Sequence, residues 1–437
     1  MPTQVIIADD LTGAMDTGVL FARKYPRVSV LFDKNFIDEM ARQNDALIID
    51  TESRNIPSEN AYSIVREYVE SLSDTGSELI YKKIDSTLRG NIGRELEAIL
   101  DTGAFDMIAL APALTLNGRT TLNGCHYLNG RLLTESDLAS DPFSPVKSSY
   151  IPDIVKGQTV LNTSVVSLKD IRAGNGFLSE VLNNLHINGC RIAVMDAETE
   201  GDLDNIVKAL GVSKLKVLPC GSAGLFSRMF AAGESDNRTY TEESGMDNCR
   251  QSHIKKDKPL VVLSGSPAKI SKLQIAYAQN NGEYVVKLDG DRIIATEAMA
   301  SAEINRVKNL ALQTLGTGGN IIIDAAGAGK NDLNEAFSGR PEKLLEASRK
   351  LQNAIACIAE EIAGNAEISG MLIFGGDTAL SICRRLGAKA LRIMGEVEPL
   401  VPYGTFVGGR LNGMYVATKA GGFGSESIIP NTVRYFR

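Results

Sequence analysis

Short apolar runs, rich in β-branched residues, alternate with helix-length segments along the chain, and this alternation constrains the fold more than any other feature. In the first half the apolar runs cover residues 5–8, 28–32, 46–50, 78–84 and 107–112. Strands this apolar are buried on both faces, so we expect helices to cover both sides of a parallel sheet. The pattern predicts an α/β protein built from three-layer domains.

A polar segment, residues 232–258, interrupts the alternation and contains almost no aliphatic residues. With 437 residues, the chain is long enough for about two or three domains. We therefore predict one α/β domain over 1–231, a linker over 232–258 and a second α/β domain over 259–437, with the ligand site in a cleft between the domains. Within the first domain, Gly/Asn turns in residues 117–150 predict a hairpin followed by a long loop.

The charge balance disfavours several classes of partner. Lys and Arg number 46 against 53 Asp and Glu, which gives a net charge of −7, and the chain has no Trp. Such a chain has no overall basic field to hold nucleic acid or an anionic membrane. Six scattered cysteines, without a C-x-x-C pair or metal-ligand spacing, fit a protein of the reducing cytoplasm with no dedicated metal site. No apolar stretch approaches the roughly 18 residues of a spanning helix.

Charged and hydroxyl side chains follow three strands of the first domain. Asp9 and Asp10 end the first, and Arg54 follows the third. The fourth is followed by a cluster of cations, a carboxylate and a hydroxyl: Lys83, Asp85, Ser86 and Arg89. Because ligands gather at the carboxyl ends of parallel strands, this mixture suits a small carboxylated, polyhydroxylated molecule. The alternatives are that Asp9 caps a helix, that Ser86 caps another, and that Arg54 and Arg119 are solvated surface residues.

Glycines and hydroxyls mark the corresponding positions of the second domain: Ser264, Gly375, Gly376, Asp377, Thr378, Gly421 and Gly422. Glycine allows backbone N–H groups to approach phosphate oxygens closely, and a helix N-terminus adds a favourable dipole. Together these loops favour a nucleotide site, although each alone is more often a tight turn. Neither the G-x-x-x-x-G-K-[ST] loop nor a G-x-G-x-x-G after the first strand is present. His126 is the one histidine placed to act as a base, and a carboxylate is the better candidate.

Seven motifs occur in order: ADDLTGAMD, KKIDSTLRGN with Glu95, PALTLNGRTT, DPFSPV, LSGS with Gln274, GGDTA and KAGGFG. This series resembles that of the four-carbon acid sugar kinase family over nearly the whole chain. The chain departs from the family pattern at three positions: Asp377, where many relatives have Glu; Leu400, where they have Gly; and Ala420, where Ser is common.

The resemblance implies an N-terminal sugar-acid-binding domain, a C-terminal nucleotide-binding domain, and ATP-dependent phosphorylation of threonate, erythronate or an oxo-tetronate at the terminal O4 hydroxyl. It places these residues at the sugar acid: Asp10, Arg54, Lys83, Asp85, Ser86 and Arg89. It places these at ATP: Ser264, Gly375, Gly376, Asp377, Thr378, Gly421 and Gly422. We expect Mg²⁺ to bridge the phosphates with few protein ligands, and Asp10 or Asp85 to accept the hydroxyl proton. A homo-oligomer is compatible with the resemblance.

Two other functions are weighed against this one. A non-catalytic sensor of sugar acids and nucleotides would keep both sites without turnover, but the joint presence of acidic, basic and glycine-rich motifs argues against it. A nucleotide-dependent dehydrogenase is disfavoured by the missing dinucleotide fingerprint.

Overall fold

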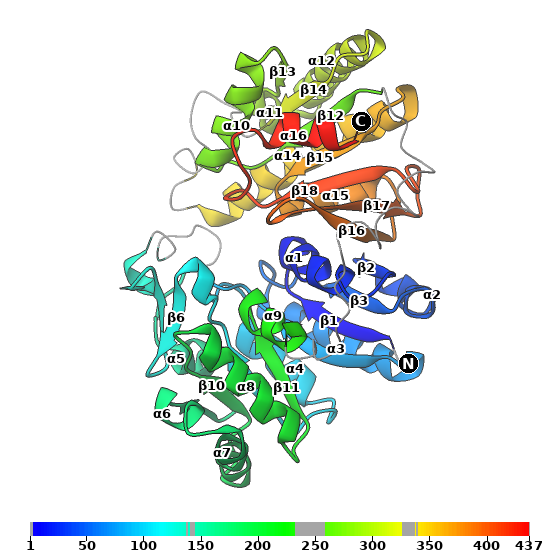
Figure 1. Cartoon of the computed structure of the whole chain (residues 1–437). Helices are drawn as coiled ribbons and strands as arrows, with labels where there is room; N and C mark the ends of the chain where they lie inside the picture. The colour runs from blue at the N-terminus through cyan, green and yellow to red at the C-terminus, as the bar shows by residue number, and fades with distance from the viewer. Residues whose placement is uncertain are drawn as a thin grey trace. The chain divides into compact units, whose positions relative to one another are not determined.

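The computed structural model describes residues 3–136, 139, 145–231, 258–325, 337 and 340–436. The chain forms two compact units, the first made of Met1–Leu20 with Ile37–Thr239 and the second of Phe21–Phe36 with Tyr240–Arg437 (Figure 1). Apart from Lys258, the predicted linker lies outside the described residues. None of the described helices is long and apolar enough to cross a membrane.

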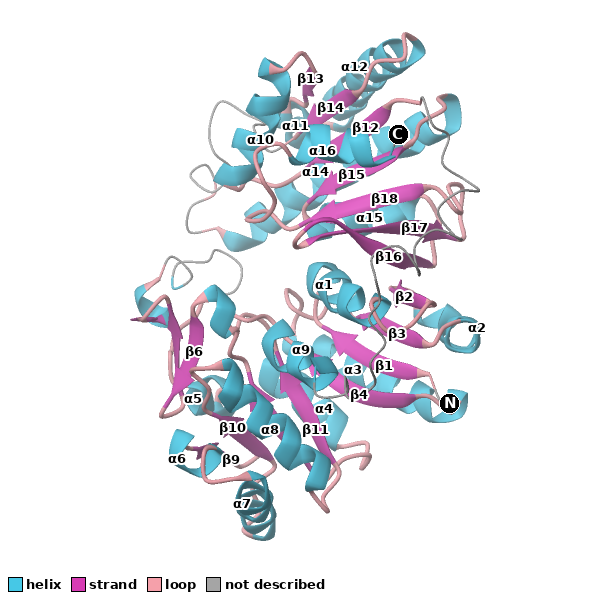
Figure 2. Ribbon diagram, viewed as in Figure 1, coloured by secondary structure: helices cyan, strands magenta, loops and turns pink. Residues whose placement is uncertain are grey.

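The first unit contains a parallel sheet in the order β3-β1-β4-β11-β5-β10-β9. Its strands are β1 (Gln4–Ala8), β3 (Ala46–Asp50), β4 (Glu78–Lys83), β5 (Met107–Ala111), β9 (Thr163–Val166), β10 (Ile192–Met195) and β11 (Val217–Gly221). Every residue of β3, β5 and β10 is buried. Helices lie on both faces of the sheet (Figure 2), which confirms the predicted α/β fold and explains why these strands are apolar throughout.

The helices of the first unit are α1 (Leu11–Ala22), α2 (Ile37–Gln43), α3 (Ser58–Thr75), α4 (Ile92–Leu100), α5 (Ile151–Lys156), α6 (Leu168–Ile171), α7 (Asn175–Ile187), α8 (Glu200–Val212) and α9 (Ala223–Ala231). Local sequence explains several of their ends. Thr199 and Asp202 form a capping box at the start of α8. Helix α3 ends at Gly76, whose φ of 67° suits a residue without a Cβ.

The predicted hairpin is present as a three-stranded antiparallel sheet of β6 (Arg119–Leu122), β7 (Cys125–Leu128) and β8 (Arg131–Leu132). Both turns are Asn-Gly pairs with positive φ, 52° and 73° at residues 123–124 and 52° and 76° at residues 129–130. Such pairs favour two-residue hairpin turns, which is why this part of the chain was readable from sequence. The following segment, which holds most of the DPFSPV motif, lies outside the described residues.

The second unit has a mixed sheet in the order β13-β14-β12-β15-β18-β17-β16-β2. Its parallel strands are β12 (Leu260–Ser264), β13 (Tyr284–Lys287), β14 (Ile321–Asp324), β15 (Gly370–Phe374) and β18 (Tyr415–Lys419). Antiparallel pairing adds β17 (Val401–Val407), β16 (Ala390–Glu398) and β2 (Val28–Leu31). The turn that contains residues 411–413 joins β17 to β18. Leu400, with φ of 65°, lies between β16 and β17, where a glycine would be unstrained.

Strand β2 has a pairing that the pattern did not predict, since residues 28–32 were expected in a parallel sheet. In the structure β2 pairs antiparallel with β16, with Leu31 opposite Ala390. An apolar, β-branched run specifies a buried strand but carries no information about its partner. The pattern therefore predicted the strand and not this antiparallel partner.

The helices of the second unit are α10 (Lys269–Asn280), α11 (Gly290–Ala295), α12 (Glu297–Gly316), α14 (Pro341–Asn365), α15 (Gly376–Arg385) and α16 (Ile428–Phe436). Helix α16 packs into the core through Ile428, Val433 and Phe436, which join Phe374 and Tyr415 of the sheet. This packing holds the chain that runs from β18 to α16, and with it the glycine-rich loop between them.

Candidate functional site

Three neighbouring strands of the first unit end at one sheet edge. Ala8 pairs with Asp50 on one side and with Lys83 on the other, so the residues that follow β1, β3 and β4 emerge together. These are Asp9 and Asp10, the segment 51–54, and the segment 84–91. The structure thus brings the carboxylates and cations predicted from sequence to one place.

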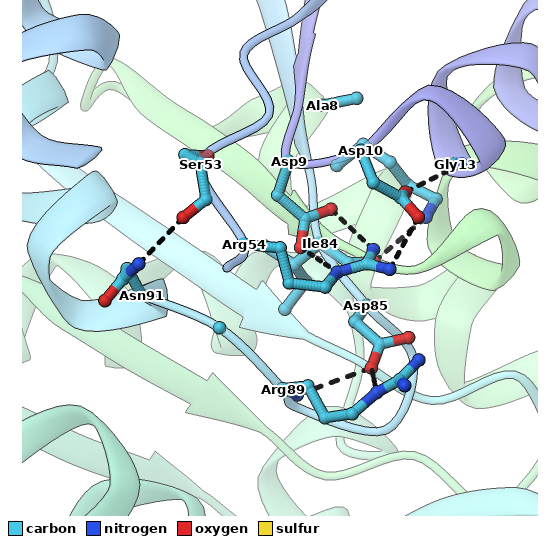
Figure 3. Close-up of polar contacts among 12 residues, drawn as sticks. Ala8, Asp9, Asp10, Gly13, Ser53, Arg54, Ile84, Asp85, Arg89 and Asn91 are labelled. Carbon is cyan, nitrogen blue, oxygen red and sulfur yellow. Dashed lines mark hydrogen bonds and ion pairs between the residues drawn. The ribbon is translucent and has the colours of Figure 1, made fainter. Parts of the chain in front are cut away.

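Arg54 joins the two aspartates of β1 (Figure 3). Its Nε and one terminal nitrogen donate to both oxygens of Asp9 at 2.9 Å, and its other terminal nitrogen donates to Asp10 Oδ2 at 2.5 Å. Burial raises the pKa of the Asp9 carboxyl, but the charges of Arg54 and the two neighbouring lysines lower it more, so Asp9 is ionised. Asp9 therefore orients Arg54, and it is Asp10 that accepts the Gly13 N–H at 2.8 Å in the first turn of α1.

Asp85 uses only one of its carboxylate oxygens within the described protein. Its Oδ2 accepts from Thr87 Oγ1 at 2.6 Å. The same oxygen accepts from Arg89 Nε at 2.6 Å (Figure 3). No described residue donates to Oδ1. Leu88, with φ of 61°, and Gly90, with φ of 99°, curl the loop around this carboxylate. Burial raises the pKa of Asp85, but Arg54 and Arg89 outweigh it and hold the pKa well below the usual range.

Ser86 is held from the hairpin. Arg119 donates to its Oγ at 2.7 Å, and His126 Nε2 lies 2.9 Å from its carbonyl oxygen. A carbonyl can only accept, so Nε2 carries the proton and Nδ1 accepts from Thr121 Oγ1 at 3.1 Å. Burial lowers the pKa of His126 to about 4, so the ring is neutral near pH 7. His126 is committed to positioning Ser86, which agrees with a carboxylate as the better candidate base.

A buried ion pair lies beneath this edge. Lys82 Nζ is 2.5 Å from Glu95 Oε2, and both side chains are almost completely inaccessible. Lys83 Nζ donates to the carbonyl of Ile84 at 2.9 Å. Asn91 donates to the carbonyls of Ser53 and Ile56, at 2.7 and 2.9 Å, and so ties the segment after β3 to the loop after β4.

Asp9 was weighed from the sequence as either a ligand-binding residue or a helix cap, and Lys82, Glu95 and Asn91 were given no individual site role. Each lies inside a motif or beside a predicted site residue, and this proximity in the sequence was the one signal that could have identified it. Their partners are 13 to 45 residues away and could not be identified from local pattern.

The second unit presents a comparable sheet edge. Ser264 at the end of β12 pairs with Phe374 of β15, which pairs with Lys419 of β18. The segments that follow contain the predicted nucleotide residues, which the structure brings together: Ser264, Gly375, Gly376, Asp377, Thr378, Gly421 and Gly422. Among them Asp377 and Gly422 are exposed, whereas Ser264 and Thr378 are buried.

Two glycines at this edge lie too close to neighbouring side chains for any other residue to fit without a shift. A Cβ on Gly265 would collide with Thr378 Oγ1, and one on Gly421 would lie 2.7 Å from Ser266 Oγ. Ser264 Oγ is buried and has no hydrogen-bond partner among the described residues. An unsatisfied buried hydroxyl beside close-packed glycines is a feature that a phosphate or ribose oxygen would satisfy. The residues therefore fit a nucleotide.

Lys419 holds the glycine-rich loop that follows it. Its ammonium donates to the carbonyls of Ala420 and Gly421, at 2.9 and 3.2 Å, and lies 4.6 Å from the centre of the Phe374 ring. Gln274 Nε2 fixes the next residues through the carbonyls of residues 423, 424 and 425. Burial lowers the pKa of Lys419 to about 8. The sequence analysis quoted both residues within motifs but gave them no role.

Metal ligands do not gather anywhere in the described part of the chain. No group of three or more His, Cys, Asp or Glu side chains in it could hold a metal ion.

Comparisons with known proteins agree with the two-unit architecture. Residues 4–229 match the family model of a sugar-binding N-terminal domain, and residues 261–429 match that of a nucleotide-binding C-terminal domain. A crystal structure of a protein from Salmonella typhimurium LT2 has the same fold, with a TM-score of 0.79, 22% identity and complete coverage of both chains.

Three characterised relatives cover nearly the whole chain. It is 33% identical to a D-threonate kinase of Salmonella typhimurium, over 99% of this chain and 97% of that protein. It is 30% identical to a D-erythronate kinase of Heliobacterium modesticaldum (100% and 97%) and 28% identical to a 3-oxo-tetronate kinase of Escherichia coli (90% and 98%). The chain therefore belongs to the four-carbon acid sugar kinase family, a family of ATP-dependent phosphotransferases.

Proposed function

We propose that this protein transfers the γ-phosphate of ATP to the terminal O4 hydroxyl of threonate, erythronate or an oxo-tetronate. The observation that carries the proposal is that the two sheet edges present different kinds of residue. One gathers carboxylates and arginines, which recognise hydroxyls and a carboxylate, and the other gathers glycines around the unpartnered hydroxyl of Ser264. The relatives named above act on acids of this class.

In the first unit, each predicted residue receives a task that follows from its contacts. Asp85 Oδ1, which has no donor in the described protein, accepts the hydrogen of the reacting hydroxyl and aims its oxygen at the phosphorus. Asp10, which is partly exposed, is the other candidate for this proton. Arg54, Lys83, Ser86 and Arg89 supply the donors that surround the acid. Phosphoryl transfer depends chiefly on positioning and charge neutralisation, so a carboxylate with a low pKa suffices at this point.

In the second unit, Ser264, the segment 375–378 and the loop at Gly421 and Gly422 hold ATP. The N-terminus of α15 adds its dipole to the backbone N–H groups of the glycine turn. Mg²⁺ bound with the nucleotide would neutralise charge on its phosphates, with water as its main additional ligand. Consistent with the cysteine pattern, we place this reaction in the cytoplasm, where ATP is available.

The test is ADP release by the purified protein with ATP and Mg²⁺. The acids are D- and L-threonate, D- and L-erythronate, and the 2-oxo and 3-oxo tetronates. We expect turnover with one acid and little with its epimer, because epimers differ in a single hydroxyl that a buried donor or acceptor can recognise. Mass and NMR analysis of the product locates the phosphate on O4 or elsewhere.

The sensor remains the second candidate, and a specific outcome would favour it. If no acid causes ADP release but one of them still raises the melting temperature, the protein binds the acid without turnover. No ADP release and no change in melting temperature with any acid would contradict the proposed substrate class.

A further inference from the structure

One arginine beside the proposed sugar-acid site has no carboxylate partner among the described residues. Arg54 is neutralised by Asp9 and Asp10, Arg89 by Asp85, and Lys82 by Glu95. Arg119, at the start of β6, makes no ion pair at all within the described protein. Its one hydrogen bond to a side chain is to Ser86 Oγ, at 2.7 Å, and its Nε is buried without a partner.

The surroundings of Arg119 are costly for a cation. The side chain is partly buried. Burial lowers its pKa, the charge of Asp85 raises it, and the nearby positive charge of Arg89 lowers it. The carboxylate of Asp85 is already paired with Arg89, so Arg119 is a partly buried guanidinium without an ion pair in the described protein. Such a group is stabilised by an anion that is supplied from outside the chain. Its planar fork fits a carboxylate through two parallel hydrogen bonds.

We propose that Arg119 binds the carboxylate of the acceptor acid and is the residue that selects acids over neutral polyols. This inference rests on the proposed function and refines it, since the motif-based assignment had given the acid's cations as Arg54, Lys83 and Arg89. The contact to Ser86 places Arg119 directly beside the loop that carries Asp85. In this arrangement the carboxylate at one end of the acid contacts Arg119, and the terminal hydroxyl at the other end contacts Asp85 Oδ1.

Lys83 is the other cation without an ion pair in the described part of this site, and its position favours a different task. A Cβ on Gly13 would lie 2.7 Å from Lys83 Nζ and 2.8 Å from Asp10 Oδ1, so the ammonium and that carboxylate oxygen flank the same point. Lys83 therefore offsets the negative charge of Asp10. Arg119 forms no ion pair in the described protein, so its planar guanidinium is available to an anion.

The experiment compares Arg119→Gln with the wild-type protein on two acceptors, the preferred acid and the tetritol with the same hydroxyls but no carboxylate. We expect kcat/KM for the acid to fall roughly 10- to 100-fold, the value of a hydrogen bond to a charged group. The kcat/KM for the tetritol should change less than about threefold, and KM for ATP should stay the same. The melting-temperature rise caused by the acid without ATP should be lost. Arg131→Gln, an exposed arginine on the same hairpin, is the matched control.

Each other outcome has a distinct meaning. Equal losses on acid and tetritol would show that Arg119 only supports Ser86, and a rise in KM for ATP would assign it to phosphate; both overturn the inference. If the wild type phosphorylates no acid but the acid still stabilises it and Arg119→Gln abolishes that effect, the proposed function fails and the inference stands. Should Arg119→Gln fold poorly, Arg119→Lys keeps the charge without the fork and should show a smaller loss confined to the acid.

Discussion

The two carboxylate oxygens of Asp85 have different surroundings. Oδ2 is saturated by Thr87 and Arg89, whereas Oδ1 has no donor in the described protein. Asp85→Asn keeps the shape but replaces one oxygen by a donor, so it should lower kcat at least about 100-fold while KM for ATP changes less than twofold. Steady-state kinetics with the accepted acid measures both, with the exposed Asp38→Asn as control. Unchanged turnover would remove Asp85 from the reaction.

The buried ring of His126 leads to a prediction about how stability depends on pH. Its pKa is lowered to about 4 in the folded protein, so between about pH 6.5 and 4 the unfolded chain binds one proton more than the folded one. This group therefore removes stability as the pH falls through that window. Comparing urea unfolding of the wild type and His126→Gln at pH 7 and pH 5, we expect the wild type to lose about 2 kcal/mol more. Identical losses would show that the ring is protonated when folded.

At the scale of elements, the loop after β18 depends on one close approach. A methyl group on Gly421 would lie 2.7 Å from Ser266 Oγ and 3.0 Å from Ala268 Cβ, so the loop or the β12–α10 turn must move. Gly421→Ala should therefore raise KM for ATP roughly tenfold or more and leave KM for the acid within twofold. Kinetics and calorimetric titration with ATP provide the measurement. Gly316→Ala, where a methyl group meets nothing within 4 Å, controls for the substitution itself; equal effects of both would contradict the steric argument.

Elements also show where sequence reasoning succeeded and where it stopped. Apolar runs predicted β1, β3, β4 and β5, and the Asn-Gly pairs predicted the hairpin, because these signals are local. The candidate residues lie together because strand ends share an edge, a rule that needs no knowledge of distant contacts. The links from Arg119 and His126 to Ser86 span 33 and 40 residues, and the partner of β2 lies more than 350 residues away, so no local pattern encodes them.

At the scale of the whole molecule, the chain does not divide at a single point. Residues 21–36 belong to the second compact unit, although the residues before and after them belong to the first. Strand β2 pairs with β16, so a fragment cut at the predicted linker would leave β16 without this neighbour. The second unit therefore depends on a segment near the N-terminus for a complete sheet.

This dependence can be tested in the full-length protein with two buried strand residues. Val30 lies in β2 and Leu47 in β3, and both are completely buried. Truncation to alanine creates a cavity and costs about 2 kcal/mol or more. Hydrogen exchange followed by mass spectrometry should show faster exchange in β16 and β17 for Val30→Ala, and in β1 and β4 for Leu47→Ala, because each strand stabilises its own unit. If Val30→Ala instead loosened β1 and β4 and spared β16, residues 21–36 would fold with the first unit, as their position in the sequence had suggested.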